Sequence, residues 1–196
     1  MIWYMLHTLR GSIAAKYNDS FVIELNGMGL KAFANTQTLS ALPPVGSEAM
    51  VYCHLIVREE KFELFAFHSE EELKFFEILN SVAGVGPKTA LGVLNMDKVP
   101  NIMSAILEKR VDVLTRASGI GKKTAERIIL ELQSKITLPQ GANSGGEMDI
   151  NRDVEDVLVG LGYARSDVRN VLQAITGKET IEERLRHALR ELGSTK

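Results

Sequence analysis

The sequence predicts an α+β protein made of several small domains, because its local pattern changes character along its 196 residues. Up to residue 67, short runs of Val, Ile and Phe alternate with turn signals, which is typical of β structure. From Ser69 apolar residues recur at helical spacing, and a stretch rich in Gly, Asn, Ser and Pro then interrupts the pattern. A chain of this length has room for a few small domains. We therefore expect domains at 1–67, 68–137 and 150–196, with a flexible linker at 138–149.

The first domain is expected to consist of short strands without an intervening amphipathic helix. Turn signals such as NGMG at 26–29 separate the apolar runs roughly every ten residues. Such spacing favours a small closed or nearly closed barrel, or a sandwich. The expected strands are 21–25, 30–34, 49–57 and 61–67.

The remainder is expected to be helical. Ser69 is a candidate N-cap, and the three glutamates after it suit the first turn of a helix. Helices with short glycine-bearing joints continue to about Ile136. After the linker, three helices with joints at Gly162 and Gly177 predict a compact three-helix domain; they are expected at 151–161, 166–176 and 180–192.

Composition argues against membranes, metals and disulfides. No apolar run approaches the roughly 18 residues of a membrane span, and the N-terminus lacks the basic leader of a signal peptide. The single cysteine, Cys53, cannot form an internal disulfide, so a cytoplasmic location is expected. It alternates with Val51 and Leu55, as a core residue of a strand would. The four histidines have no metal-ligand spacing, and we expect no metal and no cofactor.

The formal net charge of −2 is unevenly distributed along the chain. Residues 1–80 carry six basic and ten acidic side chains, residues 81–135 nine and five, and residues 136–196 eight and ten. A basic middle between acidic flanks is what a DNA-binding surface would produce, although chance clustering would give the same pattern.

An internal repeat lies in this basic segment. SVAGVGPKTALGVL at 81–94 aligns with RASGIGKKTAERII at 116–129, an offset of 35 residues. Both copies share a Gly-apolar-Gly turn followed by Lys-Thr-Ala, and each precedes a helix. Glycines permit a tight turn that backbone can approach closely, and the following helix start attracts anions. The predicted phosphate-binding residues are Gly84, Val85, Gly86, Lys88, Thr89, Gly119, Ile120, Gly121, Lys122, Lys123 and Thr124.

The motif has two other possible interpretations. A single Gly-apolar-Gly turn is often only a joint between helices, with glycines at cap positions, but two copies with the same basic tail favour phosphate binding. A nucleotide-binding P-loop fits poorly, because GIGKKT has Lys where Ser or Thr should follow Gly-Lys and because it follows a helix.

The order of these features resembles the RuvA family. The resemblance rests on LRGSI (9–13), HLIVREEKFELFAF (54–67), the two repeat copies and GLGYARSDV (160–168), and it covers nearly the whole chain. It implies an OB-fold barrel, a middle domain of tandem helix-hairpin-helix motifs that binds four-way (Holliday) junction DNA, and a tail that contacts a RuvB-type AAA+ ATPase. It also implies a homotetramer, sometimes with a second tetramer stacked on the opposite face of the junction, and allows a junction resolvase as a further partner.

The resemblance further assigns an acidic pin at the junction centre to Glu59 and Glu60. Without it, residues 58–61 would be interpreted as an ordinary solvated turn. The chain departs from the family pattern in three places. Met5 aligns with the usual first methionine, so residues 1–4 are expected to be either an extension or the result of an upstream start; Leu30 stands where an aromatic residue is common; and Lys61 directly follows the two acids.

No catalytic residue is predicted, since the sequence offers no nucleophile, metal cluster or ATP site. In the tail, Leu161 and Tyr163 are the candidates for contact with the ATPase. The alternatives are a helix-hairpin-helix repair enzyme, such as a glycosylase or nuclease subunit, and a structural scaffold. A repair enzyme would need a Lys or Asp soon after the second turn, and residues 136–146 provide neither.

Overall fold

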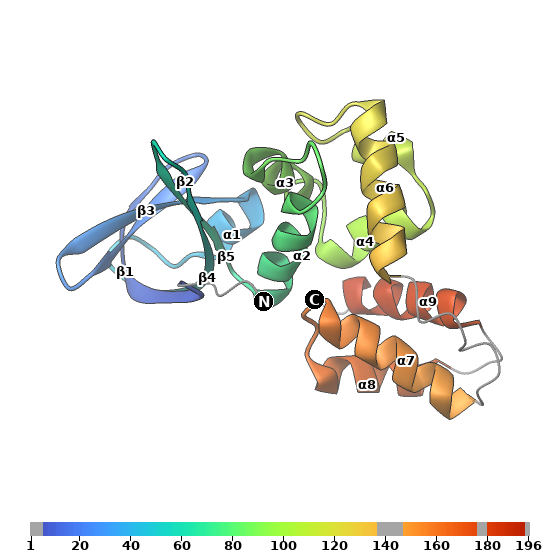
Figure 1. Cartoon of the computed structure of the whole chain (residues 1–196). Helices are drawn as coiled ribbons and strands as arrows, with labels where there is room; N and C mark the ends of the chain where they lie inside the picture. Colours follow the sequence, from blue (N-terminus) through green and yellow to red (C-terminus); the bar gives the residue numbers. More distant parts are fainter. Residues whose placement is uncertain (1–5, 137–146, 176–179, 195–196) are drawn as a thin grey trace. The chain divides into compact units, whose positions relative to one another are not determined.

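The computed structural model describes residues 6–136, 147–175 and 180–194 (Figure 1). The expected extension at 1–4, nearly all of the expected linker and the joint at Gly177 lie outside these residues. The chain forms two compact units, residues 1–73 and 74–196, and each is considered by itself.

Five strands of the first unit close into a barrel, drawn in blue to teal in Figure 1. The strand order is β1-β2-β3-β5-β4, and β1 pairs with β4 to complete the circle. Only β3 and β5 run parallel. This is an OB-like barrel, so the closed-barrel prediction is confirmed and the sandwich is excluded. The strands are β1 (Thr8–Lys16), β2 (Ser20–Leu25), β3 (Met28–Ala34), β4 (Glu48–Val57) and β5 (Phe62–Phe67).

Alternating residues of the strands fill the barrel, as the period of two requires. Ile13, Phe21 and Ile23 are completely buried at its centre. Cys53 on β4 is also buried, and burial raises the pKa of its thiol to about 11. The interpretation of Cys53 as a core strand residue is therefore confirmed, because a protonated, enclosed thiol is unreactive.

One helix of the first unit was not predicted. Helix α1 (Thr36–Ala41) lies between β3 and β4, where the sequence pattern suggested no helix. Six residues are too few to display a helical apolar period, but its start is well defined. The side chain of Asn35 accepts a hydrogen bond from the backbone N–H of Thr38 at 2.7 Å, which is an N-cap.

Helix α2 (Glu70–Asn80) begins at the predicted cap, since the Ser69 hydroxyl accepts a hydrogen bond from the Glu72 N–H at 3.2 Å. The Glu72 carboxylate, in turn, joins this helix start to α1. It accepts hydrogen bonds from Asn35 Nδ2 at 2.9 Å and Thr38 Oγ1 at 3.0 Å, and lies 2.8 Å from His68 Nδ1. Burial alone would raise the pKa of Glu72, but the hydrogen bonds from His68, Asn35 and Thr38 together with the His68 charge outweigh it and lower the pKa.

The second unit contains the remaining helices, in which α4 packs against α3, α5 and α6. In the tail, α7, α8 and α9 pack against one another, and α9 also contacts α4. The expected joint at Gly162 has φ +101°, and the helical tail begins earlier than residue 150. The helices are α3 (Pro87–Leu94), α4 (Val99–Leu107), α5 (Val111–Leu114), α6 (Lys122–Ile136), α7 (Glu147–Gly160), α8 (Arg165–Ala174) and α9 (Ile181–Ser194).

Polar contacts fix the tail helices. Glu155 on α7 accepts hydrogen bonds from Arg165 at 2.7 Å and Arg169 at 3.0 Å on α8. At the start of α9, the Thr180 hydroxyl accepts from the Glu183 N–H while the Glu183 carboxylate accepts from the Thr180 N–H. This reciprocal pair is a capping box, and it sets the first turn of the helix.

The Glu72 network predicts a pH-dependent contribution to stability. A carboxyl whose pKa is lowered in the folded state stabilises the fold above its unfolded pKa of about 4.5, and this contribution is lost as the pH falls through the folded pKa. We expect Glu72→Gln to lower the free energy of unfolding at pH 7 by about 1–3 kcal/mol. Between pH 5 and pH 3 the mutant should lose less stability than the parent. Urea unfolding at each pH measures both effects, with Glu48→Gln on the exposed surface of β4 as control. Equal acid sensitivity of parent and mutant would contradict the role of the network.

Candidate nucleic-acid interface

The two copies of the repeat fold into the same hairpin. Gly84 has φ +85° and Gly119 has φ +83°, a left-handed conformation that side-chain-bearing residues rarely adopt. The backbone hydrogen bonds around the two glycines also repeat at the offset of 35. These bonds are Val85 N–H to Val82 O (3.0 Å) and Ile120 N–H to Ala117 O (3.1 Å), followed by Ala90 N–H to Gly86 O (2.8 Å) and Ala125 N–H to Gly121 O (3.0 Å).

Each hairpin packs on its inner side against the rest of the protein and leaves its outer side open. The apolar residue between the glycines is buried: Val85 is 4% exposed and Ile120 is 6% exposed. The second glycines, Gly86 and Gly121, face open space, since a Cβ built on either meets no atom within 4 Å. The hairpin backbone is therefore supported on its inner side while its outer face remains accessible to a ligand.

The helices that follow the hairpins begin with basic residues. Helix α3 has Gly86 as its N-cap, without a side-chain cap, and exposes Lys88 in its first turn. Helix α6 begins with Lys122 and Lys123, and neither helix has an acidic residue in its first turn. The Lys122 side chain is 80% exposed, and its ion pair with Glu126 is long at 4.0 Å.

This arrangement is electrostatically unfavourable for an isolated helix. The N-terminal end of a helix carries partial positive charge and is stabilised by acidic residues, which α2, α8 and α9 place in their first turns. Lysines at the same position add like charge. An anion bound at the helix start would remove the repulsion and accept hydrogen bonds from the first-turn N–H groups, so both hairpins are suited to phosphate.

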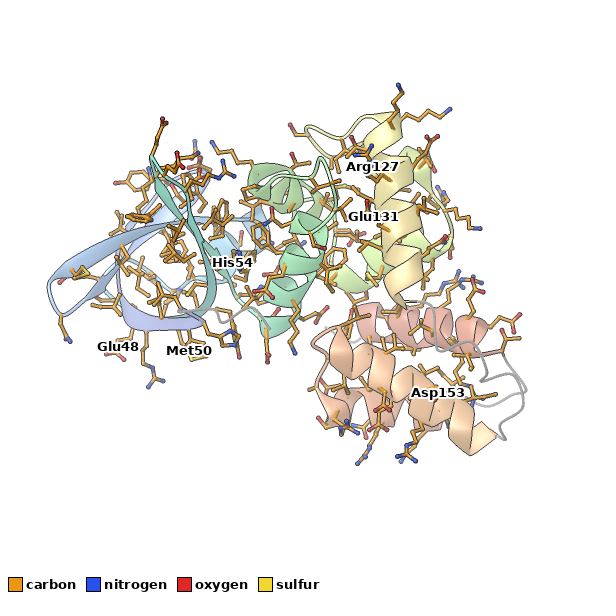
Figure 2. The ribbon with its side chains drawn as sticks, viewed as in Figure 1. Glu48, Met50, His54, Arg127, Glu131 and Asp153 are labelled. Carbon is orange, nitrogen blue, oxygen red and sulfur yellow. The ribbon has the colours of Figure 1, made fainter. Side chains whose placement is uncertain are left out.

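The structure brings the two hairpins together and adds a residue that sequence reasoning missed. Thr89 of the first motif lies beside Gly119 of the second, whose built Cβ would be 3.3 Å from Thr89 Oγ1. Arg127 on α6 (Figure 2) donates a hydrogen bond from Nη1 to the carbonyl oxygen of Ala83 at 2.9 Å. The repeat alignment contained a signal for it, because Arg127 stands where the first copy has Gly92.

The acidic tip forms the β4–β5 hairpin of the first unit. The Arg58 N–H donates to the Lys61 carbonyl at 2.9 Å, which leaves Glu59 and Glu60 exposed at the end of the turn. Lys61, which follows the two acids, instead pairs with Glu63 on β5, with Nζ 2.9 Å from Oε1. The Lys61 charge is therefore directed along the strand.

The two tail residues proposed for the ATPase contact lie in different environments. Tyr163 is only 6% exposed and belongs to the core of the tail, because the turn at Gly162 directs it inward; it does not offer a contact surface. Leu161 is half-buried and lines a pocket of about 280 Å³ together with Ile78, Met103 and Leu132.

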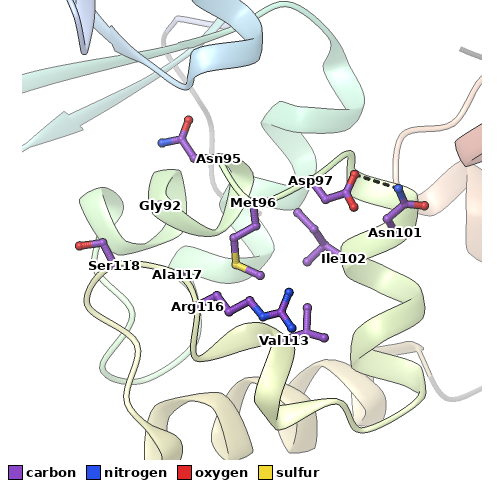
Figure 3. Close-up of a pocket in the computed structure, with 10 residues that line it drawn as sticks. All are labelled: Gly92, Asn95, Met96, Asp97, Asn101, Ile102, Val113, Arg116, Ala117 and Ser118. Carbon is purple, nitrogen blue, oxygen red and sulfur yellow. Dashed lines mark hydrogen bonds between the residues drawn. The ribbon is translucent and has the colours of Figure 1, made fainter.

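A larger pocket of about 410 Å³ lies beside the second hairpin (Figure 3). Its lining includes Gly92, Arg116 and Ser118, and the hydrogen bond between Asp97 and Asn101 crosses its rim at 2.8 Å. Among the residues that the structure describes, no cluster of His, Cys, Asp or Glu is arranged to hold a metal ion. None of the helices in that part of the chain is long and apolar enough to cross a membrane.

Comparison with known proteins agrees with this architecture. Residues 5–66 match the family described as "RuvA N terminal domain", residues 76–134 match "SAM-like Helix-hairpin-helix tandem", and residues 149–193 match "RuvA, C-terminal domain". The "Holliday junction branch migration complex subunit RuvA" of Chloroflexus aurantiacus is 40% identical over 97% of this chain and 100% of its own length. The chain belongs to the RuvA family.

Other RuvA proteins are nearly as similar. The subunit of the same name from a Thermoanaerobacter species is 40% identical over 96% of this chain and 99% of its own length. The one from Clostridium beijerinckii is 36% identical over the same shares. The similarity to RuvA thus extends over barrel, hairpins and tail.

The left-handed glycines of this RuvA-family chain should be intolerant of alanine, while their neighbours should not. Gly84→Ala places a Cβ on a residue with φ +85°, at a cost of roughly 1–2 kcal/mol. Gly86 has φ −85° and open space around it, so the loss of a glycine N-cap on Gly86→Ala, about 0.5–1 kcal/mol, should be largely offset by the reduced freedom of the unfolded chain, about 0.4–1 kcal/mol. Unfolding midpoints in urea compare the two variants. A Gly84→Ala protein as stable as Gly86→Ala would show that the hairpin does not require this conformation.

Proposed function

We propose that this chain binds four-way (Holliday) junction DNA through its backbone phosphates and serves branch migration in recombination and repair as a non-catalytic subunit. The observation that carries the proposal is the pair of hairpins, which present one lysine at the positive end of α3 and two at the positive end of α6. The RuvA relatives are named as subunits of the Holliday junction branch migration complex, which supports the same assignment. ATP hydrolysis is supplied by a partner of the RuvB type.

The hairpins suit binding that ignores base sequence. Their expected contacts are backbone N–H groups around Gly84 and Gly119 and the lysines at 88, 122 and 123, all of which address phosphate. Phosphate contacts fix the position of a protein on DNA but do not read bases. A protein that must follow a junction along any sequence needs this property.

Discrimination between a junction and linear duplex is assigned to assembly and to the acidic tip. Four copies related by rotation, a homotetramer, would present one hairpin pair to each of the four arms, and a second tetramer could cover the opposite face. Glu59 and Glu60 would then lie near the centre, where their charges repel phosphates and prevent a continuous duplex from crossing. Since Lys61 pairs with Glu63, it leaves most of this repulsion intact.

The parts of the chain divide this work. The barrel at 1–67 carries the tip, residues 68–137 hold DNA, and the tail at 150–196 contacts the ATPase. Leu161 is the retained candidate for that contact, because it keeps part of its side chain at the surface. A junction resolvase is a further partner, which would bind the face of the junction that no tetramer covers. The chromosomal substrate and the single unpaired cysteine both suit a cytoplasmic location.

The lysines of the hairpins should determine how binding depends on salt. In a titration at several salt concentrations, the parent should bind a synthetic four-way junction at concentrations that leave linear duplex free. Lys88→Ala with Lys123→Ala should weaken junction binding and reduce the slope of log affinity against log salt by about 0.9 for each lost phosphate contact.

A matched control removes the same charge elsewhere. Arg10→Ala with Arg152→Ala takes two exposed cations from the barrel and the tail, and the slope should stay at the parent value. If the lysine variant folds but retains the parent slope, the DNA lies elsewhere on the chain. If the parent binds duplex as well as junction, the proposed function is wrong.

The acidic tip should act in opposite directions on affinity and selectivity. Glu59→Gln with Glu60→Gln removes two charges without changing shape, so linear duplex should bind more tightly and the preference for the junction should fall. The effect should be largest at low salt, because screening weakens repulsion over about 10 Å at 0.1 M. Glu24→Gln with Glu48→Gln removes two exposed barrel carboxylates as control. If duplex binding by the double variant does not rise at low salt, the tip is an ordinary turn and has no role in selectivity.

A further inference from the structure

The two hairpins are connected by contacts that repeat with the sequence. At the offset of 35 residues Ala83 corresponds to Ser118, and Gly92 corresponds to Arg127. In each half, the helix of one motif touches the loop of the other at these corresponding positions. The contacts therefore have the arrangement expected of two copies related by an approximate two-fold axis.

The chemistry of the two contacts differs. On one side, Arg127 extends from α6 and donates a hydrogen bond from Nη1 to the Ala83 carbonyl at 2.9 Å. A Cβ built on Gly84, the left-handed residue of the first hairpin, would lie 3.5 Å from the same nitrogen. A guanidinium is a strong donor with a fixed fork of N–H groups, so it specifies the position of the carbonyl that it binds.

On the other side, the contact is made by backbone atoms of Gly92 and Ser118, without a long side chain. A Cβ built on Gly92 would lie 3.3 Å from the Ser118 carbonyl oxygen and 3.9 Å from the Ser118 nitrogen. Helix α3 and the second hairpin thus meet directly, at the edge of the pocket in Figure 3. Thr89 packs against Gly119 in the same region. The second hairpin is held by close packing, whereas a long side chain holds the first.

We propose that Arg127 is a positioning residue that fixes the first hairpin relative to the second, so that both phosphate sites engage one DNA arm at once. This inference rests on the proposed function. Two linked weak sites bind tightly only when their geometry allows simultaneous engagement. Without the Arg127 bond the first hairpin would sample other positions, and the gain from linkage would be lost.

Amide hydrogen exchange of the DNA-free full-length protein tests the positioning directly. Val85 and Ile120 are the reporters, since each amide donates to a carbonyl within its own hairpin. Arg127→Met should accelerate exchange at Val85 several-fold and leave Ile120 as in the parent. Gly92→Val, which wedges a side chain against Ser118, should do the reverse. Lys109→Met removes one positive charge from an exposed position of the same unit and should leave both amides unchanged.

Junction binding then separates positioning from a direct phosphate contact. Gly92→Val removes no charge, yet it should lower junction affinity about tenfold; this corresponds to about 1.4 kcal/mol. Arg127→Met should reduce the salt slope by more than the roughly 0.9 that one phosphate contact accounts for, because the whole first hairpin disengages. Arg127→Lys, which retains the charge and can still donate but lacks the fixed fork of N–H groups, should recover part of the slope. A variant that merely destabilised the fold would shift the melting temperature without changing the slope.

The outcomes are distinct. If Val85 exchange in Arg127→Met equals that of the parent, Arg127 does not position the hairpin and the inference is overturned, whatever happens to DNA binding. If Gly92→Val is too unstable to study, Gly92→Ala still requires Ser118 to shift by a few tenths of an ångström and serves instead. If the parent fails to bind junctions, the proposed function fails, while the exchange experiment still decides whether the contact positions the hairpin.

Discussion

The like charges at two helix starts are the constraint around which the second unit is organised. The peptide dipoles already make the beginning of α3 and α6 positive, and the chain adds lysines there and no acid. This costs stability in the free protein, so the hairpins need other support. The buried side chains of Val85 and Ile120 supply this support by packing into the core, and the left-handed glycines allow the chain to turn without strain. In the proposed function, an arriving phosphate would meet a site whose geometry is already formed and whose charge it neutralises, which is favourable because little reorganisation would accompany binding.

Spacing between the hairpins is the second requirement, and the repeat alone does not provide it. Duplicated motifs tend to be equivalent, but the two halves use an arginine side chain at one position and a glycine at the corresponding one. A glycine permits backbone contact, which is short and stiff, whereas an arginine spans a larger gap with a directed hydrogen bond. The asymmetry therefore allows two similar hairpins to sit at unequal distances from the helices that hold them. A helical DNA backbone presents its phosphates in a fixed pattern, and on the proposal above the two contacts would hold the hairpin pair in the arrangement that matches it.

Local signals were sufficient for most of the fold and for the hairpins, because they depend on short sequence patterns. The glycine turns and the Ser69 cap are specified within a few residues, so the sequence predicted them. Contacts between distant segments were not predicted. The Glu72 network joins the start of α2 to Asn35, far back in the sequence. Arg127 of the second repeat copy bonds to Ala83 of the first. Helix α1 was too short to show a period, and Tyr163 was assigned to a surface although the turn before it directs the ring into the core.

The difference between local signals and distant contacts also explains why the acidic tip is the least predictable part of the site. Its turn is closed by one backbone bond between Arg58 and Lys61, which many sequences would form, and nothing local distinguishes it from a solvated hairpin. In the proposed function, the two carboxylates would act through their position relative to phosphates held by other copies of the chain. Repulsion between exposed charges is weak in water for one pair, but four tips around one centre would sum over the same small volume. On this proposal, discrimination of a junction from a duplex would be a property of the assembly, whereas the phosphate sites would already be complete in a single chain.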